Sequence, residues 1–197
     1  MKSSEFLIER VVNLANDESK EKYSAEVWDI LTNSYKSIGG FKSARTPEDL
    51  IAKSGLWKLI TRDGKVTAAF IYRDQFGRKA IAMGTDGTPQ GKRDFAMIKD
   101  EDVKRERAWS EVSGAMEHIM KKAGAKPIPN KFATALSGKD IISYNPDGFH
   151  YTRDIQGHPH EKIIYGVVHL GPEEIQRFEA HGIDLHALPA NIRITKH

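Results

Sequence analysis

Hydrophobic residues in the first part of the chain recur at helical spacing. Apolar positions three, four or seven apart run through residues 3–14, and a pair of serines can cap a helix there. A second set begins near Ser24 and stops at the glycine pair 39–40. The stretch TPED at residues 46–49 places a capping threonine before a proline and acidic residues. The pattern predicts helices over residues 3–14, 24–38 and 46–54.

The pattern then changes from helical spacing to alternation. Leu56–Arg62 and Lys65–Tyr72 alternate in the manner of strands, and Asp63-Gly64 between them is a strong signal for a two-residue hairpin turn. A second turn at residues 74–77 leads to a third strand, Arg78–Thr85. The sequence therefore predicts an antiparallel meander of three strands.

A stretch with three glycines, RKAIAMGTDGTPQGK over residues 78–92, covers the third strand and the loop after it. Glycines let a backbone come close to a ligand, and the start of a helix presents unpaired N–H groups that favour an anion. We expect a ligand site at this loop, although such loops also serve as ordinary connections. The pattern beyond it predicts helices over residues 92–107, 114–123 and 171–182, and strands over 108–113, 151–155 and 162–168. FATAL at 132–136 and IISYN at 141–145 fit either a strand or a turn of helix. The C-terminal tail is expected to pack against the rest of the domain.

Composition describes an ordinary soluble protein of 197 residues, long enough for one domain with extensions. Apolar residues make up 39% of the chain and charged residues 29%, and the formal net charge is +3. Basic and acidic residues alternate, as in KRDFAMIKDEDVKRER, so an anionic partner such as nucleic acid is allowed but not required. No run approaches the roughly 18 apolar residues of a membrane span, and no signal peptide is evident. We expect a cytoplasmic protein, or one packaged from the cytoplasm into a particle.

The chain has no cysteine, which excludes disulfides, zinc–thiolate sites and thiol nucleophiles. The remaining candidates for chemistry are carboxylates, histidines and tyrosines. Glu111 shares one face of its strand with Trp109, where a carboxylate could take a proton from an amine if partial burial raised its pKa. His158 and His160 are two apart, so they could act as bases or, with a third ligand, bind one metal ion. The alternative for this pair is a surface hairpin.

The order of these elements resembles the GNAT family of N-acyltransferases, from Ser24 to Val168. The resemblance implies an α/β fold with a mixed, mostly antiparallel sheet flanked by helices. It divides the chain into a helical extension (1–23), a GNAT-like domain (24–170) and a C-terminal helix and tail (171–197). The ending HYTRDIQGHPHEKIIYG resembles bacteriophage-encoded GNAT-like proteins, which would imply a phage or host protein partner and a place in the host cytoplasm or the virion.

In that family the strand before the glycine loop and the strand after the next helix splay apart, and an acyl-coenzyme A such as acetyl-coenzyme A lies between them. The resemblance implies that its pyrophosphate sits on the loop and the helix start. The residues this assigns to the cofactor are Met83, Gly84, Thr85, Gly87, Gln90, Gly91 and Lys92. The loop departs from the family pattern Gln/Arg-x-x-Gly-x-Gly/Ala, and Pro89 removes one N–H that could have met a phosphate.

The first function hypothesis is an N-acyltransferase that acts on an amine of a protein, a small molecule or a modified nucleobase. Its catalytic candidates are Glu111, Tyr151, His158 and His160, with Tyr151 as a proton donor to the departing thiolate and the others as bases. A rival hypothesis is a GNAT-shaped binding or virion component without catalysis. A third is a metal-dependent enzyme that uses the histidine pair.

Overall fold

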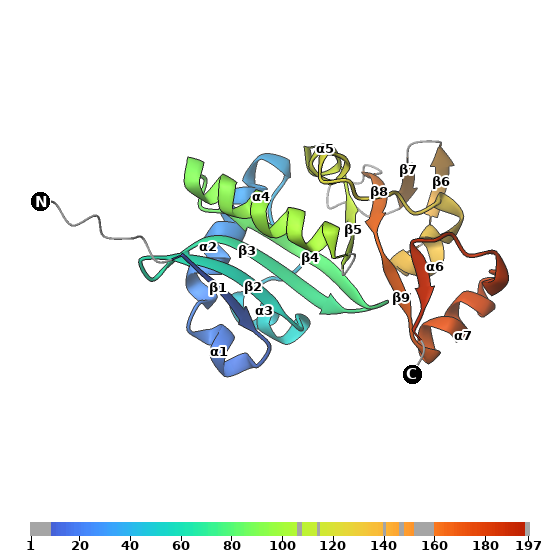
Figure 1. Ribbon diagram of the computed structural model, residues 1–197, viewed down its shortest axis with the longest axis horizontal. Coiled ribbons are helices and arrows are strands. Elements are labelled where there is room, and N and C mark those ends of the chain that lie inside the picture. The colour runs from blue at the N-terminus through green and yellow to red at the C-terminus, as the bar shows by residue number, and fades with distance from the viewer. Residues whose placement is uncertain are drawn as a thin grey trace, which may run out of the picture. The chain divides into compact units, whose positions relative to one another are not determined.

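The computed structural model describes residues 9–105, 108–113, 115–139, 141–145, 148–151 and 160–195. Eight strands form a mixed, mostly antiparallel sheet in the order β1-β2-β3-β4-β5-β8-β7-β6, and helices flank it (Figure 1). The predicted fold class is therefore confirmed. The chain divides into two compact units, a first unit of residues 1–74 and 80–99 and a second unit of residues 75–79 and 100–197. The domain boundaries after residues 23 and 170 stay predictions.

The predicted meander is present in the first unit. β2 (Trp57–Arg62) and β3 (Lys65–Asp74) are antiparallel, and β4 (Arg78–Thr85), whose first two residues belong to the second unit, has the predicted bounds. Both residues of the predicted hairpin turn have positive φ angles, 49° at Asp63 and 77° at Gly64. A turn of type I′ requires this conformation, which aspartate and glycine tolerate better than other residues.

Residues 9–14 correct the prediction for the N-terminal segment. They form a strand, β1 (Glu9–Leu14), that pairs antiparallel with β2 along its whole length. A helix over these residues is therefore wrong, because the β-branched Val11 and Val12 fit an extended strand and the ladder satisfies the backbone. The polar stretch after it forms a short helix, α1 (Asp17–Glu21), whose Asn16 cap accepts a hydrogen bond from Ser19 N–H.

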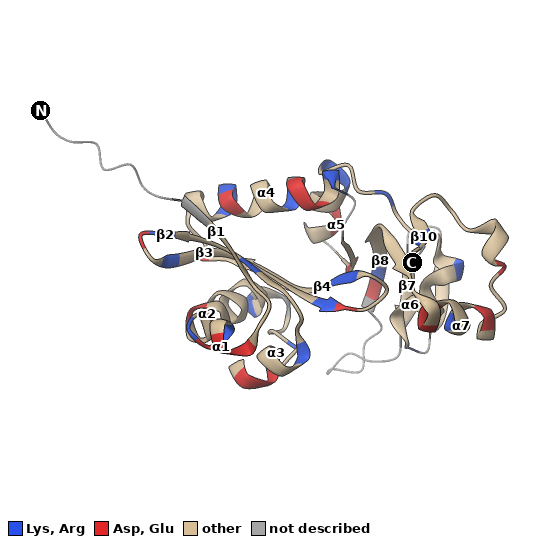
Figure 2. Ribbon diagram, turned by 60° about the horizontal axis from the view of Figure 1, so that its bottom comes forward, with Lys and Arg blue, Asp and Glu red and all other residues tan. Residues whose placement is uncertain are grey.

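The two predicted helices that follow are confirmed as α2 (Ser24–Tyr35), extended by the 3₁₀ turn η1 (Lys36–Ile38), and α3 (Pro47–Lys53). Thr46 caps α3 by accepting a hydrogen bond from Asp49 N–H. These helices and the strands bury a shared core of Leu14, Val27, Leu31, Leu50, Trp57, Leu59, Ala69, Ile71 and Ala82. α4 (Pro89–Lys104) runs along the other face of the strands of the first unit (Figures 1 and 2). There the ring of Phe95 packs against the ring of Phe70, with the two ring centres 4.7 Å apart.

Among its described residues, the second unit has four strands in antiparallel pairs and a small parallel pair. The strands are β5 (Trp109–Val112), β6 (Ile141–Asn145), β7 (Gly148–Tyr151) and β8 (His160–Gly166), with β9 (Val168–Leu170) beside β10 (Ile192–Ile194). Its helices are α5 (Ala115–Lys122), α6 (Ala133–Ser137) and α7 (Pro172–Ala180), with 3₁₀ turns η2 (Asn130–Phe132) and η3 (Leu185–Ala187). The ambiguous segments are thus a helix for most of FATAL and a strand for IISYN.

Trp109 belongs to the core of the second unit. It is fully buried, donates its indole N–H to Gln75 O at 3.0 Å and meets Phe76 edge to face. The tail packs as predicted, because β10 pairs with β9 and Asn191 Nδ2 donates to the backbone carbonyls of Lys126, Pro127 and Gly166.

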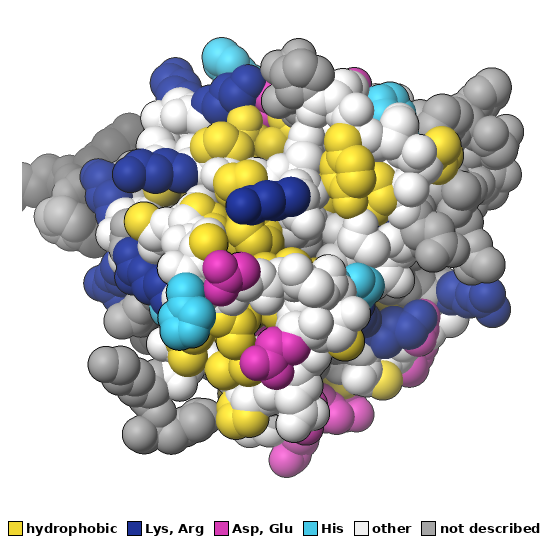
Figure 3. All heavy atoms as spheres, turned by 90° about the vertical axis from the view of Figure 1, so that its right-hand side faces the viewer, with side chains coloured by type: hydrophobic (Ala, Val, Ile, Leu, Met, Phe, Trp, Pro, Cys, Tyr) yellow, Lys and Arg dark blue, Asp and Glu magenta, His cyan; other side chains and the backbone are white. Residues whose placement is uncertain are grey.

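One face of the molecule is shown with its side chains coloured by type in Figure 3. On the face seen in Figure 3, apolar, basic and acidic side chains are interspersed. Among the helices of the described residues, none combines the length and the apolarity needed to cross a membrane.

Candidate functional site

The predicted ligand loop is shorter in the structure than in the sequence interpretation. β4 ends at Thr85 and α4 already begins at Pro89, so Gly91 and Lys92 lie in the first turn of the helix. Thr88 Oγ1 accepts a hydrogen bond from Gly91 N–H at 2.9 Å, in the manner of a helix cap. Pro89 therefore occupies the first helical position, where a missing N–H costs nothing.

The N–H groups expected to bind an anion already have protein partners. Gly87 N–H donates to Thr85 Oγ1 at 3.0 Å, and Thr88 N–H donates to Asp86 Oδ1 at 3.0 Å. Lys92 N–H donates to Thr88 O in the regular helical way. A pyrophosphate at this loop must displace side-chain acceptors, one of which is the carboxylate of Asp86.

Two glycines of the predicted site serve close packing. A Cβ at Gly84 would lie 2.6 Å from Ser34 Oγ and 3.1 Å from Ile30 Cγ2, because α2 rests directly on β4 there. A Cβ at Gly91 would lie 2.8 Å from Thr67 O and would overlap the Asp86 carboxylate. Both positions therefore need glycine whether or not a ligand binds.

Replacing Gly84 by Ala is expected to lower the free energy of unfolding by about 1–3 kcal/mol, the usual cost of overpacking. The measurement is urea unfolding. Adding Ser34→Ala should recover part of the loss, because the shortest new contact is with Ser34 Oγ. An unchanged midpoint for Gly84→Ala would contradict the close packing of α2 on β4.

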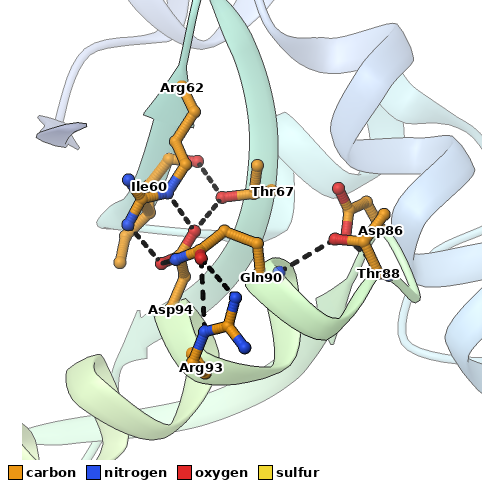
Figure 4. A network of polar contacts seen from close by, with 9 residues as sticks. Ile60, Arg62, Thr67, Asp86, Thr88, Gln90, Arg93 and Asp94 are labelled. Carbon is orange, nitrogen blue, oxygen red and sulfur yellow. Dashed lines mark hydrogen bonds and ion pairs between the residues drawn. The ribbon is translucent and has the colours of Figure 1, made fainter. Parts of the chain in front are cut away.

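A buried polar network holds the first turns of α4 against the sheet (Figure 4). Asp94, 2% exposed, accepts two hydrogen bonds from Arg62, at 2.7 and 2.9 Å, and one from Thr67 Oγ1 at 2.7 Å. Gln90 donates its amide to the other Asp94 oxygen at 2.8 Å and accepts from Arg93. These hydrogen bonds, of which those from Arg62 contribute most, lower the pKa of Asp94 to about 2, although burial acts to raise it. Gln90, predicted to touch the cofactor, is a member of this network.

The edge of β4 that faces away from β3 is lined by hydroxyl groups. Asp86 N–H donates to Thr67 O of β3, so by strand alternation the backbone groups of residues 81, 83 and 85 point to the opposite side. Ser43 Oγ donates to Ile81 O at 2.8 Å, and Tyr35 Oη accepts from Met83 N–H at 3.3 Å. Ser34 Oγ bonds both the N–H and the C=O of Thr85, at 3.2 and 3.3 Å.

Tyr35 is fixed by the packing of its ring. The ring of Phe41 packs edge to face against the rings of Tyr35 and Trp28, with ring centres 5.4 and 5.6 Å apart respectively. Burial raises the pKa of the Tyr35 phenol, and the hydrogen bond from Met83 offsets only part of that. The phenol therefore stays protonated throughout the physiological pH range.

Glu111 is an ion-pair partner in the second unit. Its side chain is 7% exposed and bonds Lys79 Nζ and, at 3.1 Å, Lys139 Nζ. Lys79 Nζ also lies 4.7 Å from the centre of the Trp109 ring. Burial alone would raise the pKa of Glu111, but the two ammonium groups outweigh it and hold the pKa below its usual value. The raised pKa expected for a general base is therefore not found at Glu111, and a catalytic role for this carboxylate stays a prediction.

The remaining catalytic candidates lie at or beyond the edge of the described residues. Tyr151 ends β7 and His160 begins β8, paired with each other through the backbone, and His158 is outside the described residues. Within the described part of the chain, no group of three or more histidine and acidic side chains is placed to hold a metal ion.

No protein-family model matches the chain, and no curated protein matches it in sequence. Solved structures do resemble it. The AHL synthase LasI aligns with a TM-score of 0.53 and 14% identity, over 82% of this chain and 90% of its own. An apo form of a mutant agmatine N-acetyltransferase aligns with a TM-score of 0.50 and 10% identity, over 80% of this chain and 99% of its own. The fold is GNAT-like.

Within this GNAT-like fold, the first unit gathers all the residues predicted for the cofactor, from Met83 to Lys92. Sequence reasoning missed Asp94 and the hydroxyls of Ser34, Tyr35 and Ser43. The only signal for Asp94 was its place on the apolar side of α4, one turn after Gln90. For the three hydroxyls, nothing in the sequence directs Ser34, Tyr35 or Ser43 to β4.

Proposed function

We propose that the protein is an acyl-coenzyme A-dependent N-acyltransferase that acts on an amine acceptor. The observation that supports this most directly is the junction of β4 and α4, where a short glycine loop meets a helix start in a GNAT-like fold. One of the similar structures is an agmatine N-acetyltransferase. The proposed acceptor is an amine of a small molecule, a protein or a modified nucleobase.

The proposed reaction joins an amine to a thioester. The amine nitrogen attacks the carbonyl carbon, a C–N bond forms and the C–S bond breaks. The proton lost by nitrogen ends on the sulfur, so an amide and a thiol result. In the proposed binding mode the edge of β4 from Met83 to Thr85 contacts the acyl-bearing arm, and the loop from Gly87 to Lys92 contacts the pyrophosphate.

The loop can present its donors to an anion after a local rearrangement. The N–H groups of Gly87, Thr88 and Gly91 bond to three exposed or half-buried side chains, and rotation of those side chains frees them. Lys92 is exposed on the first turn of α4 and adds a positive charge. Release of Asp86 from the helix start is part of the proposed binding step.

The acid and base roles are proposed for residues of the second unit. The candidates are Glu111, Tyr151, His158 and His160, of which Glu111 is the weaker base because its pKa is lowered. A bacteriophage origin, with host cytoplasm or virion as the location, stays a prediction of the C-terminal sequence.

Coenzyme A is expected to raise the melting temperature. At a free concentration 100 times the dissociation constant the stabilisation is about 2.7 kcal/mol, which for a chain of this size is on the order of 5–10 °C. The measurement is thermal unfolding with coenzyme A, acetyl-coenzyme A and, as a control for the nucleotide part, adenosine 3′,5′-bisphosphate. No shift at millimolar coenzyme A would mean that the loop is an ordinary helix cap.

A charge reversal in the loop tests where the ligand binds. Lys92→Glu should reduce the shift with coenzyme A without lowering the melting temperature of the free protein, because the side chain is exposed. Lys65→Glu reverses another exposed lysine of the first unit and should leave the shift unchanged.

A further inference from the structure

The three hydroxyls on the edge of β4 that faces away from β3 differ in the hydrogen bonds that their protons make. Ser43 Oγ donates to Ile81 O, and Ser34 Oγ accepts from Thr85 N–H and donates to Thr85 O. Tyr35 Oη accepts from Met83 N–H, and within the described part of the chain it donates to no acceptor. Each serine proton is therefore committed to the strand, whereas the phenol proton is available to a ligand.

The Tyr35 oxygen occupies the place of a neighbouring strand's carbonyl. In a β-ladder an N–H such as that of Met83 meets a carbonyl oxygen of the next strand, and here the phenol oxygen takes that position at 3.3 Å. An extended molecule bound along this edge would therefore meet the phenol O–H of Tyr35 in place of the N–H of Met83. The edge thus presents a hydroxyl donor in place of a backbone donor.

We propose that the Tyr35 phenol, rather than the Met83 amide, donates the hydrogen bond that polarises the thioester carbonyl of the bound acyl donor. This inference rests on the proposed acyltransferase function. As the amine attacks, negative charge develops on the carbonyl oxygen, and a preorganised donor stabilises that charge. The phenol keeps its proton throughout: it donates a hydrogen bond and transfers nothing.

Three features of the site suit this role. The N–H of Met83 donates to the phenol oxygen, which makes the phenol O–H a stronger donor. The contacts of the ring with Phe41 hold the hydroxyl in place, so little reorganisation accompanies the reaction. The raised pKa of Tyr35 keeps the group in its donor form.

Tyr35→Phe is the direct test, because it keeps the ring and removes only the hydroxyl. The probe is acetyl-coenzyme A with water as the acceptor, and the released thiol is measured with a thiol reagent that finds no cysteine in the chain. We expect kcat to fall about 100-fold, as when one oxyanion donor is lost. Binding of free coenzyme A, which lacks the thioester, should change less than about 2-fold.

A spectroscopic readout makes the test independent of turnover. With [1-¹³C]acetyl-coenzyme A bound, the carbonyl stretch should lie at lower frequency in the native protein than in Tyr35→Phe. Ser43→Ala, which removes a hydroxyl from the same edge whose proton is already committed, should match the native frequency and kcat. A structural role of Tyr35 would alter stability but leave this frequency unchanged.

The outcomes separate the two proposals. If the native protein does not bind acetyl-coenzyme A, the proposed function fails and this inference fails with it. If the native protein binds and Tyr35→Phe shows the same carbonyl frequency and a kcat within about 2-fold, the acyltransferase proposal stands and the role of Tyr35 is overturned.

Discussion

Asp94→Asn is expected to lower the free energy of unfolding by about 3 kcal/mol. The substitution keeps the size of the side chain but removes the charge that Arg62 meets with two hydrogen bonds, in a pair whose side chains are 17% and 2% exposed. Breaking one partner of a buried ion pair commonly costs about 3–5 kcal/mol, because the other charge loses a close compensating charge. Urea unfolding at neutral pH measures the loss. Asp63→Asn, the same chemical change in an exposed hairpin turn, should stay within about 0.5 kcal/mol.

The same carboxylate should make stability depend on acid pH. The pKa of Asp94 is lowered from 3.8 to about 2 in the folded protein, so its ionised form is favoured by folding. The resulting stabilisation, about 2 kcal/mol, is present above pH 4 and is lost as the pH falls through 2. Unfolding curves of the native chain and Asp94→Asn should therefore converge towards pH 2. A difference that stays constant across this range would mean that the charge of Asp94 is not what stabilises the network.

Local patterns sufficed where an element is specified by its own residues. The hairpin at Asp63-Gly64, the cap of α3 at Thr46 and the bounds of β4 all follow from turn chemistry, capping and alternation within a few positions. Residues 9–14 show the limit of such patterns. Their apolar spacing fits a helix and a strand equally, and only β2, more than forty residues later, decides in favour of the strand.

The candidate site was predictable in position but not in its contacts. The glycines marked the loop, yet two of the partners of Asp94 come from β2 and β3. Basic and acidic residues occur along the length of α4 (Figure 2). In the run KRDFAMIKDEDVKRER one buried carboxylate looks like any solvated charge. The sequence indicates Glu111 as a candidate, but the direction of its pKa shift depends on lysines 32 and 28 residues away in the chain. Burial and ion pairs between distant residues depend on the tertiary structure and cannot be predicted from the spacing of residues in the sequence.

Glu111→Gln is expected to lower the free energy of unfolding by about 3 kcal/mol, and it separates an ion-pair role from a catalytic one. The amide keeps the shape but leaves Lys79, 13% exposed, beside a neutral group. Lys139 is 41% exposed and is relieved by water, so Lys139→Met should cost less than about 1 kcal/mol. Because the pKa of Glu111 is lowered on folding, its stabilisation should be present at neutral pH and lost in acid.

A double-mutant cycle with Lys79→Met tests whether the charge pair is the source of this effect. If the carboxylate serves chiefly to neutralise Lys79, the double variant Lys79→Met/Glu111→Gln should lose less free energy of unfolding than the two single variants lose together, because both charges of the pair are then absent. The second measurement is kcat, from thiol release by acetyl-coenzyme A at a temperature where every variant is folded. A general base would lose most of its kcat in Glu111→Gln and would not regain it in the double variant. A loss of stability that the second substitution relieves, with kcat retained, is what the two lysines and the lowered pKa of Glu111 predict.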